Sequence, residues 1–318
     1  MDFKGLIKPE NINWINGLPI AVEIYSVSSM SPRIHNGVLE IVICLEGECD
    51  FTFAFEQHRF EKGDFLSVDE DAFSLQNGKN CICASIYFDL QRFIDRYPLI
   101  NYTLFACEGT KKNKYVAKYN KLKGLILSFL CYLSKNSQWD DNVLAEYANA
   151  LIDVMVLQFN LPSYHIGGEE VSLDNFIRIL NVNKYIIDGV NEGYNIGLED
   201  VAARLGLTPG YVSEFLRGYR FGFRDMISYT RAAKAEKYLM SGDYAIVDIS
   251  EECGFSDAKY FYKAFRKWHN MGPREFREKY REMSKMEESI RELNIRDERI
   301  LKYIEAEMYE HYLLYFAP

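Results

Sequence analysis

The sequence predicts a multidomain α+β protein: an N-terminal antiparallel β-barrel with a helical hairpin, then an all-α C-terminal domain with two helix-turn-helix motifs. Three patterns indicate this class. Residues 20–90 alternate between apolar and polar side chains, and residues 114–160 change to helical periodicity. A motif of helically spaced apolar residues, a glycine and a hydroxyl residue then occurs twice, in 198–219 and 246–268.

The N-terminal region, residues 1–110, has the pattern of an antiparallel barrel or sandwich. Alternating segments such as 40–45 and 81–88 are separated by turns rich in glycine, asparagine and charged residues. Strands with turn signals at this spacing are typical of small all-β domains.

Residues 111–160 are expected to form the helical hairpin. One helix is predicted near Tyr115–Leu133 and a second near Asp141–Phe159, because apolar residues recur on one side of each. These apolar faces pack either on the barrel or on a second copy of the chain as a dimer interface. Residues 161–174, with a proline and paired glycines, are predicted to be a linker.

The repeated motif predicts a turn and a helix start in each copy. Gly206 is placed where the first copy turns, and Thr208 can cap the next helix. Gly254 and Ser256 are the corresponding residues of the second copy. Residues 175–280 carry a net charge of +2, whereas 1–174 carry −8, so the motifs lie in the only part of the chain that is not acidic.

At this point residues 181–280 resemble the DNA-binding domain of AraC/XylS-type transcription regulators. The resemblance rests on 196–202, 205–213 and Tyr229, Arg231 and Ala235 in the first half, and on 246–257, 260–267 and 272–277 in the second. The N-terminal region is similar, more loosely, to the cupin-like sensor barrel of that family. The resemblance implies two subdomains, within 175–280, that are bridged by a helix near 222–239. Each places a recognition helix in the major groove of double-stranded DNA.

The resemblance also implies which residues face DNA. The base-facing positions would be Gly210, Ser213, Glu214, Ala258, Lys259, Tyr262 and Lys263. The phosphate contacts would be Thr208, Arg217, Arg220, Arg231, Ser256, Arg266 and Lys267. Glu214 stands where relatives often carry arginine, so it either accepts a hydrogen bond from cytosine or pairs with Arg217 or Arg220. We therefore expect the second motif to dominate the affinity for DNA.

The barrel is expected to bind a small-molecule effector and no cofactor. The family resemblance suggests a sugar or a similar metabolite. Tyr25, Arg33, His35 and Glu40 are the candidate polar contacts, or they stabilise strand ends. Gly37 and Phe73 stand where metal-binding cupins carry histidine, so we expect no metal site of that kind. The cysteines of Cys81-x-Cys83 are expected to be core residues.

Residues 281–318 are predicted to be a helical tail that extends beyond the family domain, with a break at Asn294–Asp297. It docks on the barrel, on another protomer or on its own domain. The chain shows no signal-peptide core, no membrane-spanning run and no catalytic motif, so we expect a cytoplasmic protein that is not an enzyme.

The leading function is a ligand-responsive, homodimeric transcription regulator, which would contact RNA polymerase if it activates. The alternatives are a constitutive regulator whose barrel only dimerises and a cupin-type enzyme fused to a DNA-binding module.

Overall fold

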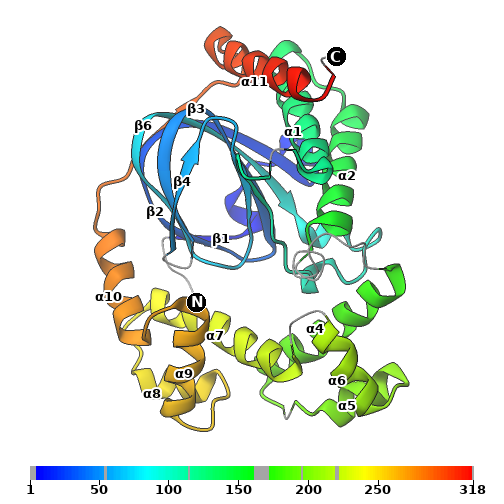
Figure 1. Cartoon of the computed structure of the whole chain (residues 1–318). Helices are drawn as coiled ribbons and strands as arrows, with labels where there is room; N and C mark the ends of the chain where they lie inside the picture. The colour runs from blue at the N-terminus through cyan, green and yellow to red at the C-terminus, as the bar shows by residue number, and fades with distance from the viewer. Residues whose placement is uncertain are drawn as a thin grey trace. The chain divides into compact units, whose positions relative to one another are not determined.

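The computed structural model describes residues 5–53, 56–113, 115–160, 172–194, 196–218 and 222–316. The chain divides into two compact units, whose elements are labelled in Figure 1. The sheet unit comprises Ile7–Asp95, Phe105–Phe159 and Met286–Pro318, and the helical unit comprises Met1–Leu6, Arg96–Leu104 and Asn160–Lys285. The chain therefore leaves the sheet unit, forms most of the helical unit and returns to the sheet unit.

The strands of the described residues form one sheet. They are β1 (Leu6–Ile7), β2 (Ile20–His35), β3 (Val38–Phe53), β4 (Glu56–Glu61), β5 (Phe65–Val68), β6 (Phe73–Asp89), β7 (Glu108–Gly109) and β8 (Ser289–Leu293). The order is β1-β2-β6-β3-β5-β7, with β4 paired to β3 and β8 paired to β2. The predicted α+β class is confirmed, but the expected closed barrel is an open sheet, because no pairing between β1 and β7 closes it in the described residues.

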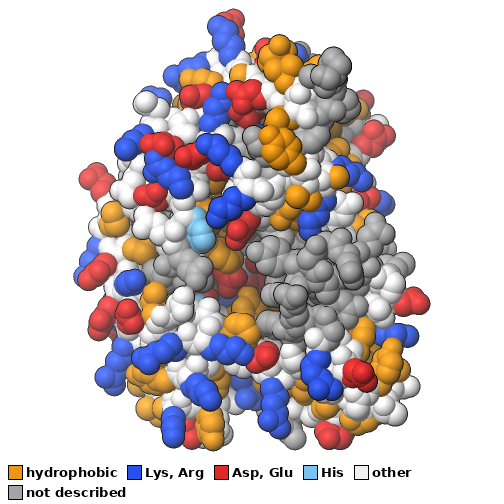
Figure 2. All heavy atoms as spheres, in the orientation of Figure 1, with side chains coloured by type: hydrophobic (Ala, Val, Ile, Leu, Met, Phe, Trp, Pro, Cys, Tyr) orange, Lys and Arg blue, Asp and Glu red, His pale blue; other side chains and the backbone are white. Residues whose placement is uncertain are grey.

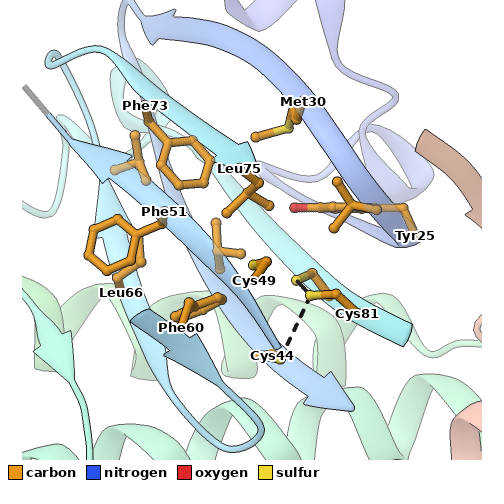
Figure 3. Packing of buried hydrophobic residues seen from close by; sticks show 14 residues of the cluster. Tyr25, Met30, Cys44, Cys49, Phe51, Phe60, Leu66, Phe73, Leu75 and Cys81 are labelled. Atoms are coloured by element: carbon orange, nitrogen blue, oxygen red, sulfur yellow. Dashed lines mark hydrogen bonds between the residues drawn. The ribbon is translucent and has the colours of Figure 1, made fainter. Parts of the chain in front are cut away.

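The core of the sheet unit lies on the inner face of the long strands. Figure 3 shows aromatic, aliphatic and cysteine side chains from several strands meeting there, among them Phe51, Phe60 and Phe73. Residues 38–45 of β3 are all buried, which means that both faces of the strand are covered along this run. The unit also carries the short 3-10 helices η1 (Pro9–Asn11), η2 (Ile15–Gly17) and η3 (Leu90–Phe93).

The predicted hairpin is present as α1 (Ala117–Lys135) and α2 (Asp141–Gln158). The side chain of Asp140 caps α2 by accepting hydrogen bonds from two backbone amides of its first turn. The apolar residues of both helices are buried within the sheet unit; they include Leu122, Ile126, Phe129, Leu130, Leu144, Leu151 and Met155. Most of the apolar surface of α1 and α2, which could have formed a dimer interface, is thus buried within one chain.

The tail differs from the predicted pair of helices. Its first part is the strand β8, which pairs antiparallel with β2 and places Leu293 opposite Ile24. Its second part is the helix α11 (Glu298–Phe316), which packs along α1. The helical spacing of apolar residues in the first part is overridden because β2 offers an edge with unpaired backbone groups there.

The helical unit contains both predicted motifs. Its helices are η4 (Ile100–Tyr102), α4 (Leu173–Glu192), α5 (Leu198–Leu205), α6 (Pro209–Gly218), α7 (Phe223–Ser241), α8 (Ile246–Glu252), α9 (Ala258–His269) and α10 (Pro273–Ser284). The first motif is α5 with α6, the second is α8 with α9, and α7 packs against α4, α8, α9 and α10. Leu173 and Asp174, assigned to the linker, begin α4, and the rest of that segment up to residue 171 lies outside the described residues.

The turns of the two motifs follow the sequence prediction. Gly206 and Gly254 have φ values of 67° and 77°, in the left-handed region that glycine adopts at little cost. Asn270 has φ of 56° and ends α9 in the same left-handed region, which asparagine tolerates better than most residues. Among the described residues, no helix is long and apolar enough to cross a membrane.

Candidate functional sites

The recognition helix of the second motif, α9, begins with an aspartate cap. The Asp257 carboxylate accepts a hydrogen bond from the Tyr260 backbone amide at 3.0 Å. The sequence had indicated Ser256 for this role, and that expectation is wrong. Aspartate also adds a negative charge at the positive end of the helix dipole, which favours it over serine. Ser256 is exposed, one residue before the Asp257 cap.

The outward face of α9 is cationic. Lys259, Lys263 and Arg266 are all exposed, and their spacing of four and then three residues places them on one side of the helix. None of the three forms an ion pair with another residue that the structure describes. Ala258 and Tyr262 are partly buried beside them. Figure 2 shows Lys and Arg side chains gathered on the lowest part of the visible face, where Figure 1 places α8 and α9.

Two of the predicted phosphate contacts already have partners inside the helical unit. The Lys267 ammonium pairs with the carboxylate of Asp225 on α7 and lies 4.4 Å from the Trp268 ring centroid. The Arg231 guanidinium lies 5.8 Å from the Phe255 ring centroid, and burial lowers its pKa. Both cations hold the second motif against α7, so they are less available to DNA than Lys259, Lys263 and Arg266.

The recognition helix of the first motif, α6, has a different surface. Thr208 Oγ1 accepts a hydrogen bond from the Tyr211 backbone amide at 3.2 Å, as expected of a cap. Gly210, Glu214 and Arg217 are exposed, and Ser213 is partly buried. Glu214 forms no ion pair with any described residue, so the expected pair with Arg217 is absent. Arg220 lies outside the described residues.

Sequence reasoning gave no DNA-facing role to Tyr211, an aromatic residue that is 45% exposed at the start of α6. Its hydroxyl accepts a hydrogen bond from Arg178 Nη1 of α4 at 3.4 Å. The signal was present in the sequence, since Tyr211 follows Gly210 at the first turn of the recognition helix. Arg178 could not be found in this way, because it reaches the motif only through the packing of α4.

The four candidate effector contacts of the sheet unit lie in one polar cluster. His35 Nε2 is 2.8 Å from Glu40 Oε2, and both side chains are buried. The Tyr25 and Ser85 hydroxyls are 3.0 Å apart. Burial raises the pKa of Glu40, but hydrogen bonds from His35 and Ser85 and the nearby Arg33 charge outweigh it, so the pKa of Glu40 lies below its ordinary value. The sequence prediction therefore selected residues that the fold brings together.

A small cavity opens beside this cluster. Its volume is about 120 Å³, and it is lined by Glu23, Ile24, Tyr25, Met30, Arg33, Ile290 and Glu292. Tyr25 and Arg33 line it, whereas His35 and Glu40 are not among its lining residues. Two of its lining residues, Ile290 and Glu292, belong to the tail strand β8, which the sequence did not connect with this site.

The helical unit matches known proteins directly. A protein-family model described as a helix-turn-helix domain matches residues 201–279. The regulatory protein PocR of Salmonella typhimurium is 33% identical over 91 residues, which are 28% of this chain and 30% of PocR. The matches to the regulator YijO and to the urease operon transcriptional activator of Escherichia coli span 35% and 27% of those proteins. The chain thus aligns with only about a third of each of these relatives.

Other comparisons extend over most of the chain. The uncharacterized HTH-type transcriptional regulator YpdC of Escherichia coli is 23% identical over 286 residues, which are 86% of this chain and 92% of YpdC. A crystal structure of ToxT from Vibrio cholerae aligns over 81% of this chain and 97% of ToxT, with a TM-score of 0.41 and 14% identity. With its paired helix-turn-helix motifs and the family model matched over residues 201–279, the helical unit carries an AraC-type helix-turn-helix domain similar to those of known transcriptional regulators.

Proposed function

We propose that the protein binds specific DNA sequences through α6 and α9 and that a small polar effector in the sheet unit controls this binding. The observation that carries the proposal is a row of exposed cations on α9, Lys259, Lys263 and Arg266, which form no ion pair within the part of the chain that the structure describes. A cation that is not already paired within the protein can neutralise a DNA phosphate, and this releases the counterions that were condensed on the DNA. The position of the three α9 cations on the second helix of a helix-turn-helix motif puts them at the major groove.

The two recognition helices have unequal roles in this proposal. On α9, Lys259, Lys263, Ala258 and Tyr262 face bases, and Arg266 contacts phosphate. On α6, Gly210, Ser213 and Glu214 face bases, and Thr208 and Arg217 contact phosphate. The carboxylate of Glu214 is repelled by phosphates and tolerated only where it accepts a hydrogen bond from a base such as cytosine. The second motif therefore anchors the protein, and the first adds selectivity.

The effector site is the cavity beside Tyr25 and Arg33. A volume of about 120 Å³ is below the roughly 300–1,000 Å³ of typical small-molecule pockets. It admits only a small ligand, and its polar walls favour a polar metabolite such as a sugar. Because Ile290 and Glu292 of β8 form part of the wall, the ligand would also contact the tail.

We further propose that the protein acts in the cytoplasm as a homodimer and contacts RNA polymerase where it activates. Since the apolar faces of α1 and α2 are buried within one chain, the dimer would use other surfaces. The end of α11 exposes Tyr309, Tyr312, Leu313 and Leu314. Sedimentation of the wild type and of Tyr309→Lys, with Glu310→Lys as the matched control, tests this. A monomeric wild type contradicts it.

DNA binding is tested by selecting duplexes from a random pool with the full-length protein and measuring the affinity for the enriched sequence by fluorescence anisotropy. We expect one enriched sequence family whose binding weakens steeply with salt. The variant Lys259→Ala/Lys263→Ala should bind it at least about 10-fold more weakly, while the control Lys279→Ala, exposed on α10, binds as the wild type does. A pool without enrichment contradicts the proposal.

Effector binding is tested by a thermal-shift screen of small polar metabolites, with Arg33→Met as the variant that alters the cavity wall. A compound that raises the melting temperature of the wild type and not that of Arg33→Met supports the site. If no compound stabilises the wild type and none changes its affinity for DNA, the protein binds DNA constitutively and the effector proposal is wrong.

A further inference from the structure

Four cysteines meet inside the sheet unit. Cys44 and Cys49 lie on β3, and Cys81 and Cys83 lie on β6; each is at most 2% exposed. Figure 3 shows Cys44, Cys49 and Cys81 directed toward one another within the apolar core, with the contact between Cys44 and Cys81 dashed. Neither the effector site nor the DNA-binding surface uses these thiols.

The sulfur atoms are close enough to share one ion. Cys81 Sγ lies 4.0 Å from Cys44 Sγ and 3.6 Å from Cys83 Sγ. The three sulfur atoms all lie within 4.8 Å of one another. The Cys49 thiol interacts with those of Cys81 and Cys83, but its sulfur atom is not part of the group of three that lie within 4.8 Å of one another.

The arrangement depends on an irregular stretch of β3. Cys44 pairs directly with Cys83 across the ladder, and Cys81 faces the same side as Cys83 because side chains alternate along a strand. Cys44 and Cys49 are five residues apart, so a regular strand would place them on opposite faces. Register shifts on both sides of Glu46 bring Cys49 into the same core.

Gly47 permits this irregularity. Its φ is 75°, and a Cβ atom there would lie 2.3 Å from the Asn80 carbonyl oxygen. Asn80 itself has a positive φ of 49°. Two residues in the left-handed region, facing each other across the β3–β6 ladder, maintain a local geometry that gathers the thiols, and such bulges recur at functional positions.

We propose that Cys44, Cys81 and Cys83 bind one thiophilic d10 metal ion, Zn²⁺ or Cu⁺, and that the neighbouring Cys49 thiol moves closer to become the fourth ligand when the ion binds. A Zn–S bond of about 2.3 Å places the sulfurs of a tetrahedral site about 3.8 Å apart. The distances of 3.6 and 4.0 Å lie on either side of this value. Thiolates are the ligands that select zinc and copper(I) over harder ions.

Binding involves no redox step. Each coordinating thiol gives its proton to solvent, and its sulfur donates an electron pair to the metal, so the sulfur and the metal keep their oxidation states. Because the site is buried, we expect the ion to be incorporated as the sheet unit folds rather than to enter the finished core. The alternative is four small side chains that only fill the core, since sulfur atoms in van der Waals contact lie at similar distances.

The test is to refold the metal-free, fully reduced full-length protein without oxygen in the presence of Zn²⁺ or of Cu⁺, and to measure bound metal by elemental analysis after dialysis. We expect one ion per chain in at least one arm. Co²⁺ in place of Zn²⁺ should give the thiolate charge-transfer absorption of a tetrahedral site. Less than about one ion per ten chains in both arms overturns the proposal, whatever the variants do.

The variants Cys81→Ser and Cys83→Ser should each lower the affinity for the metal more than about 100-fold. This loss exceeds the roughly 10- to 100-fold caused by removing a residue that only hydrogen-bonds to a metal ligand. Cys107→Ser is the matched control, because Cys107 is also buried in the sheet unit but lies outside the group. If the cluster variants fail to fold, the wild type decides: its melting temperature must rise with the metal. Equal metal binding by Cys81→Ser and Cys107→Ser also overturns the proposal. DNA binding enters none of these measurements.

Discussion

His35 and Glu40 face each other across the turn between β2 and β3, with Nε2 and Oε2 2.8 Å apart. Each is at most 2% exposed, in a sheet whose neighbouring positions are mostly apolar. A carboxylate buried to this degree is tolerated only when its oxygens have partners. The pair therefore fixes the polar cluster next to the cavity, and His35 positions Glu40 rather than contacting a ligand itself.

Replacing Glu40 by glutamine keeps the shape of the side chain but removes its charge. We expect Glu40→Gln to lower the free energy of unfolding by about 1–3 kcal/mol, because a buried charge-assisted hydrogen bond becomes a neutral one. Urea unfolding measures this. Glu108→Gln, at an exposed position of β7, is the control and should change it by less than about 0.5 kcal/mol. Equal effects of the two changes would show that the pair contributes no stability.

The recognition helices can be ranked by two alanine substitutions. Lys263→Ala should weaken binding to the selected operator by about 5- to 100-fold and reduce its salt dependence, because an exposed cation is removed from α9. Glu214→Ala should leave the affinity unchanged or raise it. Anisotropy titrations at several salt concentrations measure both. A larger loss from Glu214→Ala would make α6 the anchoring helix.

The helical unit should lose stability in mild acid through His269. Burial lowers the pKa of His269 to about 4, against about 6.5 for an unfolded histidine. Between these values the unfolded chain binds the extra proton, so the free energy of unfolding falls as the pH falls through this window. The full effect of a shift of about 2.5 pH units is about 3 kcal/mol, reached below about pH 4.

The measurement is urea unfolding followed by tryptophan fluorescence at several pH values in this window. His269→Gln should unfold with a smaller dependence on pH than the wild type. Glu236 is the carboxylate that faces this ring, with its Oε2 3.8 Å from His269 Nδ1, so the difference between the two proteins reports the titration of His269 together with its effect on Glu236. Identical pH dependence in the two proteins would exclude His269 as the cause.

The helix α11 is expected to be part of the sheet unit's core. Ile304 is completely buried on it, so Ile304→Ala should lower the free energy of unfolding by about 2–5 kcal/mol. Leu313→Ala, at a residue of the same helix that is 45% exposed, should change it by less than about 0.5 kcal/mol. Guanidinium unfolding monitored by circular dichroism distinguishes the two. Equal small effects would mean that α11 is held only loosely.

The features that the sequence predicted are those set by local chemistry. The two helix-turn-helix motifs follow from periodic apolar residues and from Gly206 and Gly254, whose left-handed conformations are properties of single residues. The α1–α2 hairpin follows from its apolar periodicity in the same way. The grouping of Tyr25, Arg33, His35 and Glu40 was predicted because they lie within 16 residues of one another in the sequence, on β2 and the start of β3.

The features that were missed depend on distant parts of the chain. Strand β8 forms because β2 has a free edge, and no pattern within Ser289–Leu293 reveals that edge. The meeting of Cys44 and Cys83 requires the register of β3 and β6, and that of Cys49 requires the bulge at Gly47. Asp257 rather than Ser256 caps α9. Both side chains can accept a hydrogen bond from the first turn of a helix, so the sequence did not show which of the two adjacent residues would be the cap.

The return of the chain to the sheet unit has a consequence for severed protein. With β8 paired to β2 and α11 packed along α1, the sheet unit is built from both halves of the sequence. A protease site inserted between Asn160 and Ser172 would therefore produce two fragments that complement each other and purify together. Each half alone would lack part of the shared core. In the C-terminal fragment, β8 would have no strand to pair with and α11 no helix to pack on, so both would fold only when the N-terminal fragment is present.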